Sequence, residues 1–294
     1  MIASRFARRS VVLLVLAVAA GCAPAVQYPR VVLTFGGVSS GPSLARNIAL
    51  DNSGLIYVAD YGDGRVQVFD QQGGLARQWT TTNRQNVRLD GLAVDRAGTV
   101  LATLDGAINR FDGSTGKPLG QVAYDPGPWF YDLATASNGL VATWVNGHDD
   151  VIVFSAAGQA TQIITDAVSS AAGKPEYNLR VAIGLNGSIF VLGTSNNTVV
   201  QYDSNGQPVN HFGGRGDQPG QLLGSNDIAI DDHGRVYVSD DQGIQLFDPT
   251  GAYRGVIKLP DNSVGYGLAF DLSGAMFVLG DQGKVYKYLL APSS

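Results

Sequence analysis

The stretch Asn226-Asp-Ile-Ala-Ile-Asp-Asp-His-Gly-Arg-Val-Tyr-Val-Ser-Asp-Asp-Gln-Gly-Ile-Gln-Leu-Phe-Asp248 decides the fold, because variants of it recur six times along the chain. It contains three short segments, 227–231, 235–239 and 244–247, in which apolar residues alternate with polar or β-branched ones. Such alternation is typical of β-strands. The turn between the first two segments ends in Gly234, and glycine accepts without strain the positive φ that a three-residue hairpin loop needs. The stretch therefore predicts consecutive hairpin-connected strands.

The six copies share two columns of small residues. Their first strands are predicted at 47–51, 91–95, 132–136, 180–184, 227–231 and 267–271. The third residue of each is alanine: Ala49, Ala93, Ala134, Ala182, Ala229 and Ala269. A glycine follows each strand, and these glycines recur every 40 to 48 residues, the length that four strands and their turns require. Repeats of this length made of strands indicate a β-propeller.

The composition agrees with an all-β fold. The 294 residues include 38 glycines, 45% are hydrophobic and only 15% are charged. We predict a six-bladed propeller of four-stranded antiparallel blades, with the alanines around the central axis. An aromatic residue ends each third strand and is expected to fill the space between blades: Phe69, Phe111, Phe154, Tyr202, Phe247 and Tyr288.

The outermost strand of the last blade is expected from the other end of the chain. Fourth strands are predicted at 75–79, 121–124, 160–164, 209–212 and 253–258, but the last copy ends after three strands. The segment 31–35 is an unpaired strand of matching type. We expect it to complete the last blade and close the ring, which removes an exposed sheet edge.

The first copy resembles a known repeat. Ile48-Ala-Leu-Asp-Asn-Ser-Gly-Leu-Ile-Tyr-Val-Ala-Asp-Tyr-Gly-Asp-Gly-Arg-Val-Gln-Val-Phe-Asp70 is similar to the NHL repeat, and Phe212-Gly-Gly-Arg-Gly-Asp-Gln-Pro-Gly-Gln-Leu222 resembles the loop between blades in that family. The resemblance covers about residues 31–290 and implies the propeller fold. It does not fix the function, because NHL propellers serve several.

The N-terminus is predicted to be a targeting segment. Arginines precede the apolar run 11–20, which is too short to span a bilayer comfortably. The run ends in Val18-Ala-Ala-Gly-Cys22, which resembles the lipobox of bacterial lipoproteins. The resemblance implies a signal peptide at 1–21, acylation of Cys22, a tether over 22–30, the propeller at 31–290 and a short tail at 291–294. The protein is then expected in the bacterial cell envelope, outside the cytoplasm and anchored to a membrane by lipid.

Charge and cysteine content exclude two classes of function. Removal of the signal peptide takes away Arg5, Arg8 and Arg9 and leaves 17 Lys and Arg against 25 Asp and Glu. An acidic domain argues against nucleic acid as a partner, since that binding needs clustered Lys and Arg. Cys22 is the only cysteine, so an intrachain disulfide and a thiol catalyst elsewhere in the chain are both excluded.

Candidate ligand-binding residues gather where the first strands begin. In a propeller these positions surround one mouth of the central channel, and mixed charges, amides and phenols around a concavity suit a polar ligand. The candidates are Arg46, Asn47, Asp90, Trp129, Tyr131, Asp132, Arg180, Asn226, Asp227 and Tyr266. The alternative is a channel mouth that is only solvated. His148, His211 and His233 fall in different blades and faces, so we predict no metal site and no catalytic residue.

Three functions remain open. The first is a non-catalytic, membrane-anchored module that binds protein, peptide or glycan through the loop face and needs no cofactor. The second follows from the resemblance: some similar six-bladed propellers are metal-dependent lactonases or lyases, and Asp90, Asp132, Asn226 and Asp227 offer oxygen ligands for calcium. The third is a structural component of the envelope.

Overall fold

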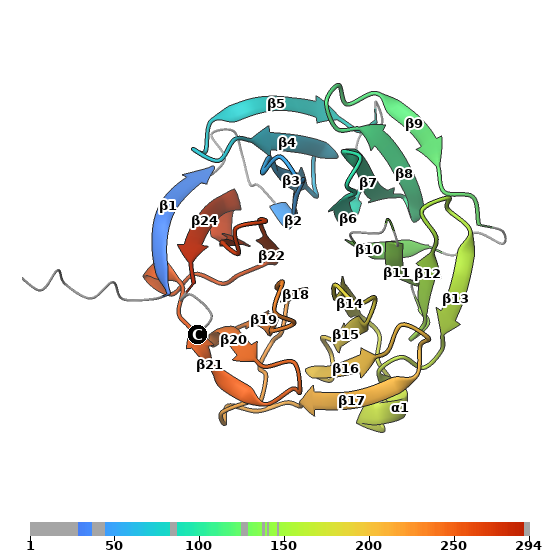
Figure 1. Cartoon of the computed structure of the whole chain (residues 1–294), viewed down its shortest axis with the longest axis vertical. Helices are drawn as coiled ribbons and strands as arrows, with labels where there is room; N and C mark the ends of the chain where they lie inside the picture. The colour runs from blue at the N-terminus through green and yellow to red at the C-terminus, as the bar shows by residue number, and fades with distance from the viewer. Residues whose placement is uncertain are drawn as a thin grey trace, which may run out of the picture.

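A computed structural model describes residues 29–36, 45–82, 87–124, 129–136, 139, 141–145 and 147–290, except the side chain of Asp261. Six four-stranded antiparallel sheets form a ring (Figure 1), which confirms the predicted six-bladed β-propeller. The predictions for the signal peptide, Cys22 and the last four residues lie outside the described residues. None of the helices in the described ranges is long and apolar enough to cross a bilayer.

Each blade runs from an inner strand at the axis to an outer strand at the rim. Blade 1 consists of β2 (Ala45–Leu50), β3 (Ile56–Asp60), β4 (Arg65–Phe69) and β5 (Leu75–Thr80). Blade 2 consists of β6 (Leu89–Val94), β7 (Thr99–Leu104), β8 (Ala107–Asp112) and β9 (Pro118–Gln121). Blade 3 consists of β10 (Phe130–Thr135), β11 (Val141–Val145), β12 (Val151–Phe154) and β13 (Ala160–Ile164).

The second half of the ring follows the same order. Blade 4 consists of β14 (Leu179–Ile183), β15 (Ile189–Gly193), β16 (Thr198–Tyr202) and β17 (Pro208–Gly213). Blade 5 consists of β18 (Asp227–Ile230), β19 (Val236–Asp240), β20 (Gly243–Phe247) and β21 (Tyr253–Ile257). Blade 6 consists of β22 (Gly267–Phe270), β23 (Met276–Leu279), β24 (Lys284–Leu289) and, from the other end of the chain, β1 (Arg30–Gly36).

The N-terminal strand closes the ring as predicted. β1 pairs antiparallel with β24, from Arg30 opposite Leu289 to Gly36 opposite Lys284. The first described strand is therefore the outer strand of the last blade, so the two ends of the propeller are held in one sheet.

Two details differ from the sequence expectations. The outer strand of blade 2 is 118–121 rather than 121–124, because Gly116 closes a tight turn by donating to the carbonyl of Asp112 at 2.7 Å. Tyr124 instead packs its ring against Phe130 and Phe154, with centroids 5.9 and 5.6 Å away. A one-turn helix α1 (Ser169–Ala172) and two 3₁₀ turns, η1 (Pro260–Asn262) and η2 (Asp281–Gly283), were not expected.

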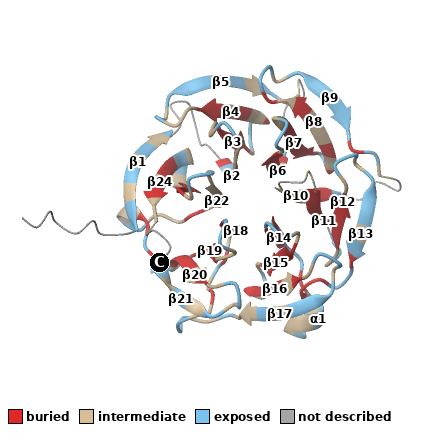
Figure 2. Ribbon diagram, viewed as in Figure 1, coloured by how far each residue is buried: buried red, intermediate tan, exposed pale blue. Residues whose placement is uncertain are grey.

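The hydrophobic core lies between the blades. Each of six buried clusters joins side chains from two adjacent blades, and together they run around the whole ring. The second strands are buried almost throughout, and the outer strands are largely exposed (Figure 2). The six aromatics at the ends of the third strands are all buried, so their predicted role as packing between blades is confirmed.

The alanine column surrounds the axis as predicted, and all six alanines line a central cavity of about 220 Å³. One inner strand approaches its neighbour even more closely. A Cβ atom on Gly91 of β6 would lie 2.3 Å from the carbonyl oxygen of Tyr131 and 3.0 Å from the amide nitrogen of Leu133, both backbone atoms of β10. Only glycine allows these two blades to meet at this separation.

We expect Gly91→Ala to destabilise the protein by about 2 kcal/mol, because backbone cannot yield as a side chain can. Gly267→Ala is the matched control in β22, where the new Cβ would lie 3.0 Å from the methyl Cγ2 of Ile48 and 3.1 Å from the carbonyl oxygen of Arg46, both farther away than the carbonyl of Tyr131 is at Gly91. Urea denaturation should show a clearly smaller loss of stability for Gly267→Ala than for Gly91→Ala. Equal costs for the two variants would contradict this account of the contact between blades 2 and 3.

Candidate functional site

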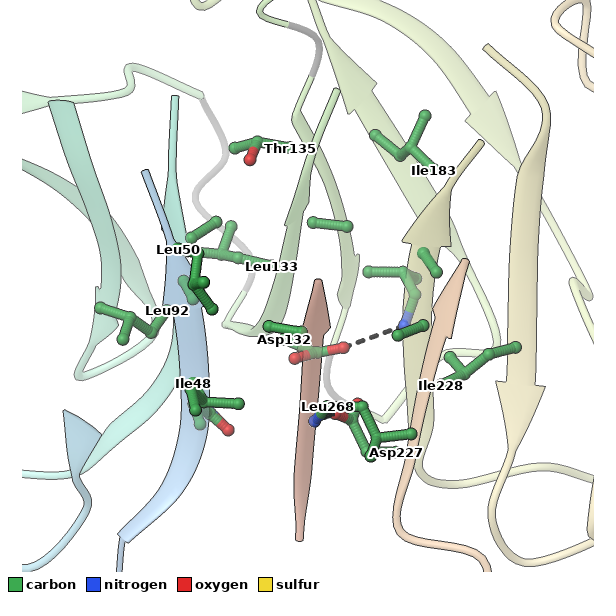
Figure 3. Close-up of a pocket in the computed structure, with 18 of the residues that line it drawn as sticks. Ile48, Leu50, Leu92, Asp132, Leu133, Thr135, Ile183, Asp227, Ile228 and Leu268 are labelled. Atoms are coloured by element: carbon green, nitrogen blue, oxygen red, sulfur yellow. Dashed lines mark hydrogen bonds between the residues drawn. The ribbon is translucent and has the colours of Figure 1, made fainter. Parts of the chain in front are cut away.

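The lining of the central cavity is polar at one end and mostly apolar toward the other. The cavity is lined at one end by the polar side chains of Asn47, Asp132 and Asp227, then by the alanine column. The residues directly before and after the alanines also line it and are mostly apolar: Ile48, Leu50, Leu92, Val94, Leu133, Thr135, Val181, Ile183, Ile228, Ile230, Leu268 and Phe270. The polar groups therefore lie toward the face at which the inner strands begin (Figure 3).

These three polar side chains connect neighbouring blades. The Asn47 amide nitrogen donates to the carbonyl of Asp90 at 2.6 Å, joining blades 1 and 2. The amide of Val181 donates to Asp132 Oδ2 at 2.9 Å, joining blades 3 and 4 (Figure 3). The amide of Leu268 donates to Asp227 Oδ2 at 2.7 Å, joining blades 5 and 6. Each side chain therefore has a structural role, whatever else it does.

The two channel carboxylates influence each other's ionisation. Burial, followed by the negative charge of Asp132, raises the pKa of Asp227 to about 7, against the opposing effects of Arg180 and the amide of Leu268. Burial also raises the pKa of Asp132, again opposed by Arg180. The channel thus favours a state in which the pair carries less than two negative charges near neutral pH.

A second cavity, here named the mouth pocket, opens beside the channel entrance and has a volume of about 300 Å³. Strands and loops of blades 1 to 4 contribute its lining: Arg46, Asn47, Tyr61, Arg88, Asp90, Tyr131, Trp144, Tyr177, Asn178 and Arg180. Only Asn47 is shared with the channel cavity. The pocket therefore combines three guanidinium groups, four aromatic rings, two amides and one carboxylate.

Contacts between cations and rings order the mouth pocket. The guanidinium of Arg88 lies 5.1 Å from the ring centroid of Tyr61 and 5.8 Å from that of Tyr131, and that of Arg46 lies 5.5 Å from Tyr61. Tyr131 stacks on Trp144 with centroids 5.1 Å apart. Such contacts are favourable and hold the long arginine side chains over the aromatic wall.

Asp90 is the single acid of the mouth pocket. Burial raises its pKa, while Arg88, Arg180 and Arg46 oppose that rise. Its carboxylate lies 3.6 Å from the guanidinium of Arg88. All three arginines are therefore close enough to act on one carboxylate.

The structure brings some of the predicted site residues together and separates others. Arg46, Asn47, Asp90, Tyr131 and Arg180 line the mouth pocket, and Asp132 and Asp227 line the channel beneath it. The remaining three candidates line neither cavity: Trp129, Asn226 and Tyr266.

Trp129 lies against Gly106 and lines a separate cavity with Tyr124 and Phe130, away from the channel mouth. The Asn226 amide nitrogen donates to the carbonyl of Gly224 at 3.1 Å. Burial and the neighbouring Asp281 raise the pKa of Tyr266, whose hydroxyl is thus directed to a local partner. None of the three joins the cluster of charged and aromatic groups.

Five residues of the mouth pocket were not predicted: Tyr61, Arg88, Trp144, Tyr177 and Asn178. Tyr61, Arg88, Tyr177 and Asn178 each lie within two residues of an inner or second strand on the loop face, and Trp144 lies one residue before the end of β11. Their positions in the repeats therefore carry the same signal as those of the predicted residues.

The buried side chain of Glu176, the only glutamate, holds the loop that presents Tyr177 and Asn178. Its Oε1 accepts the amides of Tyr177, Asn178 and Ser195 at 2.9, 3.0 and 3.2 Å, and its Oε2 accepts that of Asn196 at 2.9 Å. The carboxylate thereby ties the start of blade 4 to the loop between β15 and β16.

We expect Glu176→Gln to cost about 2 kcal/mol of stability, since the new amide group would face backbone donors that need an acceptor. Amide hydrogen exchange should also rise at 177, 178, 195 and 196. The control Asp217→Asn changes an exposed carboxylate that accepts only from Gln218, so stability should not change. Unchanged exchange in Glu176→Gln would contradict the role given to this carboxylate.

One group of potential metal ligands occurs among the described residues outside these cavities. Ligand atoms of Asp231, Asp232 and His233 lie within 4.8 Å of one another. However, Asp231 already accepts the amides of His233 and Arg235 at 3.0 and 2.9 Å, the Arg235 guanidinium at 2.6 Å and the Tyr237 hydroxyl at 3.2 Å. Its oxygens are occupied by the protein, and we assign it a structural role.

Comparison with known proteins agrees with the fold. The model of the NHL repeat matches residues 45–69. Among solved structures, a gluconolactonase from Xanthomonas campestris is 16% identical with a TM-score of 0.66, covering 85% of this chain and 87% of that one. A streptogramin B lyase is 14% identical with a TM-score of 0.61, covering 87% and 96%.

A virginiamycin B lyase from Staphylococcus aureus is 12% identical with a TM-score of 0.62, covering 86% and 83%. None of the curated proteins matches the chain in sequence. At these identities the likeness concerns the fold and leaves the chemistry of the site open. The chain is a six-bladed β-propeller that carries an NHL repeat.

Proposed function

We propose that the protein is a binding propeller that holds a protein, peptide or glycan partner at the mouth pocket. The observation that supports this proposal is that three arginines and four aromatic residues from four blades line one cavity. Arginine and aromatic side chains are enriched where binding energy concentrates. The proposal needs no group with catalytic chemistry.

The rim of the pocket is suited to a partner larger than the cavity. Tyr177 is 69% exposed beside the pocket, and Arg46 and Asn178 are also exposed. Because the four bonds of Glu176 hold this rim in place, little conformational freedom is lost on binding.

Membrane attachment is the second part of this proposal. An acylated Cys22 would hold the propeller outside the cytoplasm at a bacterial membrane, with several acyl chains contributing about 0.8 kcal/mol per buried CH₂. Metabolic labelling with a fatty-acid analogue should mark the wild-type protein and not Cys22→Ala. Equal labelling of the two would remove this part of the proposal and leave the mouth pocket untouched.

Capture from an envelope extract tests the binding site. The double variant Arg46→Ala/Tyr177→Ala removes an arginine and the exposed ring from the mouth. The control Leu185→Ala/Leu272→Ala removes apolar side chains that are 68% and 80% exposed on turns of the opposite face. A component retained by the wild type and the control, but lost with the mouth variant, is the expected result. The reverse pattern would place the site on the opposite face.

A second candidate is a metal-dependent enzyme of the lactonase or lyase type, and the paired channel carboxylates favour it. Burial and then repulsion by Asp132 raise the pKa of Asp227, and a cation between the two carboxylates would offset both effects. With Asn47 on the same cavity, the donors are the oxygen atoms that calcium prefers. These residues would hold the cation, and a bound cation would supply polarisation of a carbonyl group. The fold neighbours include a gluconolactonase and two lyases by name.

Thermal unfolding with and without calcium at pH 7.5 tests this candidate without a substrate. Calcium should raise the Tm of the wild type and leave the Tm of Asp132→Asn/Asp227→Asn unchanged. If the wild type shows no shift at millimolar calcium and contains no divalent metal after purification, this candidate is excluded.

A further inference from the structure

The charge of the mouth pocket is opposite to that of the chain. The whole chain carries a net charge of -5, yet the pocket contains three arginines and one aspartate. Asp90 faces Arg88 at 3.6 Å. Arg46 and Arg180 form no ion pair within the described ranges of the chain. The pocket is therefore a local positive site on an acidic protein, which attracts anions.

The three arginines are not equivalent. Arg180 donates to the Asn178 side chain at 3.2 Å and to the carbonyl of Leu179 at 3.0 Å, and its charge also acts on Asp132 and Asp227 in the channel. Arg46 and Arg88 instead lie over the ring of Tyr61 and are mostly exposed. Arg46 and Arg88 are thus the two donors that can turn to a ligand.

Trp144 belongs to the buried wall of the mouth pocket. This side chain lines the pocket and is only 3% exposed. Its indole nitrogen Nε1 is buried and has no hydrogen-bond partner in the part of the chain that the structure describes. The indole ring stacks on the ring of Tyr131 with centroids 5.1 Å apart, so Trp144 is a fixed part of the pocket wall.

We propose that the mouth pocket is a carboxylate site, with Arg46 and Arg88 as the ligand's cationic donors. This inference rests on the proposed function, in which the mouth pocket holds the ligand. The planar guanidinium group matches a carboxylate through two parallel hydrogen bonds. The rings of Tyr61, Tyr131 and Tyr177 line the remainder, so the carboxylate is carried by an aromatic or apolar body.

Two sources share this chemistry: a free aromatic acid and the C-terminal carboxylate of a peptide. The cavity volume of about 300 Å³ accommodates either a small acid or one terminal residue. The probes are therefore benzoate for the first source and N-acetylphenylalanine for the second, with benzamide and N-acetylphenylalanine amide as their neutral counterparts.

Tryptophan fluorescence reports binding directly. The chain has three tryptophans, so Trp79→Phe/Trp129→Phe leaves Trp144 as the only one. At least one of the two carboxylate probes should change its emission saturably, and its neutral counterpart should not. Calorimetry with the wild-type protein gives the same affinity by a route that does not depend on the double variant folding.

Arginine variants assign the donors. Arg46→Gln and Arg88→Gln should each weaken binding of the carboxylate at least about tenfold, while Arg254→Gln, on the outer strand β21, should not change it. Binding should weaken with added salt. Tighter binding of benzoate points to a free acid, and tighter binding of N-acetylphenylalanine points to a peptide terminus.

Three results would overturn the inference: no saturable binding of either carboxylate to folded protein, equal binding of the neutral counterparts, or equal loss in Arg254→Gln. Inorganic phosphate that binds as tightly as the carboxylates, with the same dependence on Arg46, would overturn the choice of carboxylate. If the capture experiment still depends on Arg46 and Tyr177 while no carboxylate binds, the mouth pocket remains the binding site and only its ligand class is wrong.

Discussion

Replacing Asp231 by alanine is expected to destabilise the propeller by about 4 kcal/mol, because breaking a buried, hydrogen-bonded ion pair leaves its partners unpaired. Asp231 is 4% exposed and accepts two backbone amides, the Arg235 guanidinium and the Tyr237 hydroxyl. Burial, followed by the charge of Asp231, raises the pKa of Tyr237, so that hydroxyl stays a donor. The change removes an acceptor that organises both the hairpin and its buried neighbours.

Blade 2 provides the matched control for this change. Asp95 occupies the same position as Asp231 and accepts the amides of Ala97 and Thr99 at 2.9 and 2.8 Å. Thr99 and Leu101 stand where blade 5 has Arg235 and Tyr237. Asp95→Ala should therefore cost only about 1 kcal/mol. Urea denaturation gives the change in the free energy of unfolding for both variants, provided that the m-value stays constant. Equal changes would show that the contacts of Asp231 with Arg235 and Tyr237 add no stability.

Replacing Asp227 by asparagine should remove a large part of the pH dependence of stability between about pH 4 and 7. The pKa of Asp227 is raised to about 7 in the folded protein, from an ordinary value of 3.8. Between these values the folded state holds a proton that the unfolded state has released. The wild type therefore loses stability as the pH rises through this window, by at most about 1.4 kcal/mol per pH unit.

Asparagine keeps an oxygen acceptor for the amide of Leu268 and carries no charge. Asp227→Asn should match the wild type below about pH 4 and be more stable than the wild type at pH 7 and above. Asp132 adds pH dependence of the same sign, since its pKa is also raised by burial. Asp217→Asn, an exposed change, should keep the wild-type profile. Parallel profiles for the wild type and Asp227→Asn would show that the channel does not hold this proton.

The repeat-encoded features were predictable because the residues that specify them are close in sequence. The residues that specify a hairpin and its inner alanine all lie within one copy of the repeat. Six copies therefore predict the same blade, even where a single copy matches the repeat poorly. Ring closure followed from the missing fourth strand of the last copy and the spare strand at 31–35. The outer strand of blade 2 was misplaced because the tight turn at Gly116 is not visible as a pattern.

The candidate site was predictable only in part. Residues that begin inner strands had to meet at one mouth, which placed Arg46, Asp90 and Arg180 together. Trp129 lies elsewhere because its ring packs on Gly106, in the turn between the second and third strands of blade 2. Tyr177 lies two residues before β14, and the orientation of its loop depends on Glu176, which accepts amides about 20 residues away. Contacts between residues so far apart in the sequence produce no repeating pattern from which they could be predicted.

Site-specific photo-crosslinking in intact cells tests the central claim, that the channel mouth on the loop face is where the protein meets its ligand. A photoreactive residue is placed at Tyr177 or Arg46, and for comparison at Leu272 on the opposite face. The account predicts a defined adduct from positions 177 and 46 and none from 272. An adduct that forms from position 272 alone would contradict it.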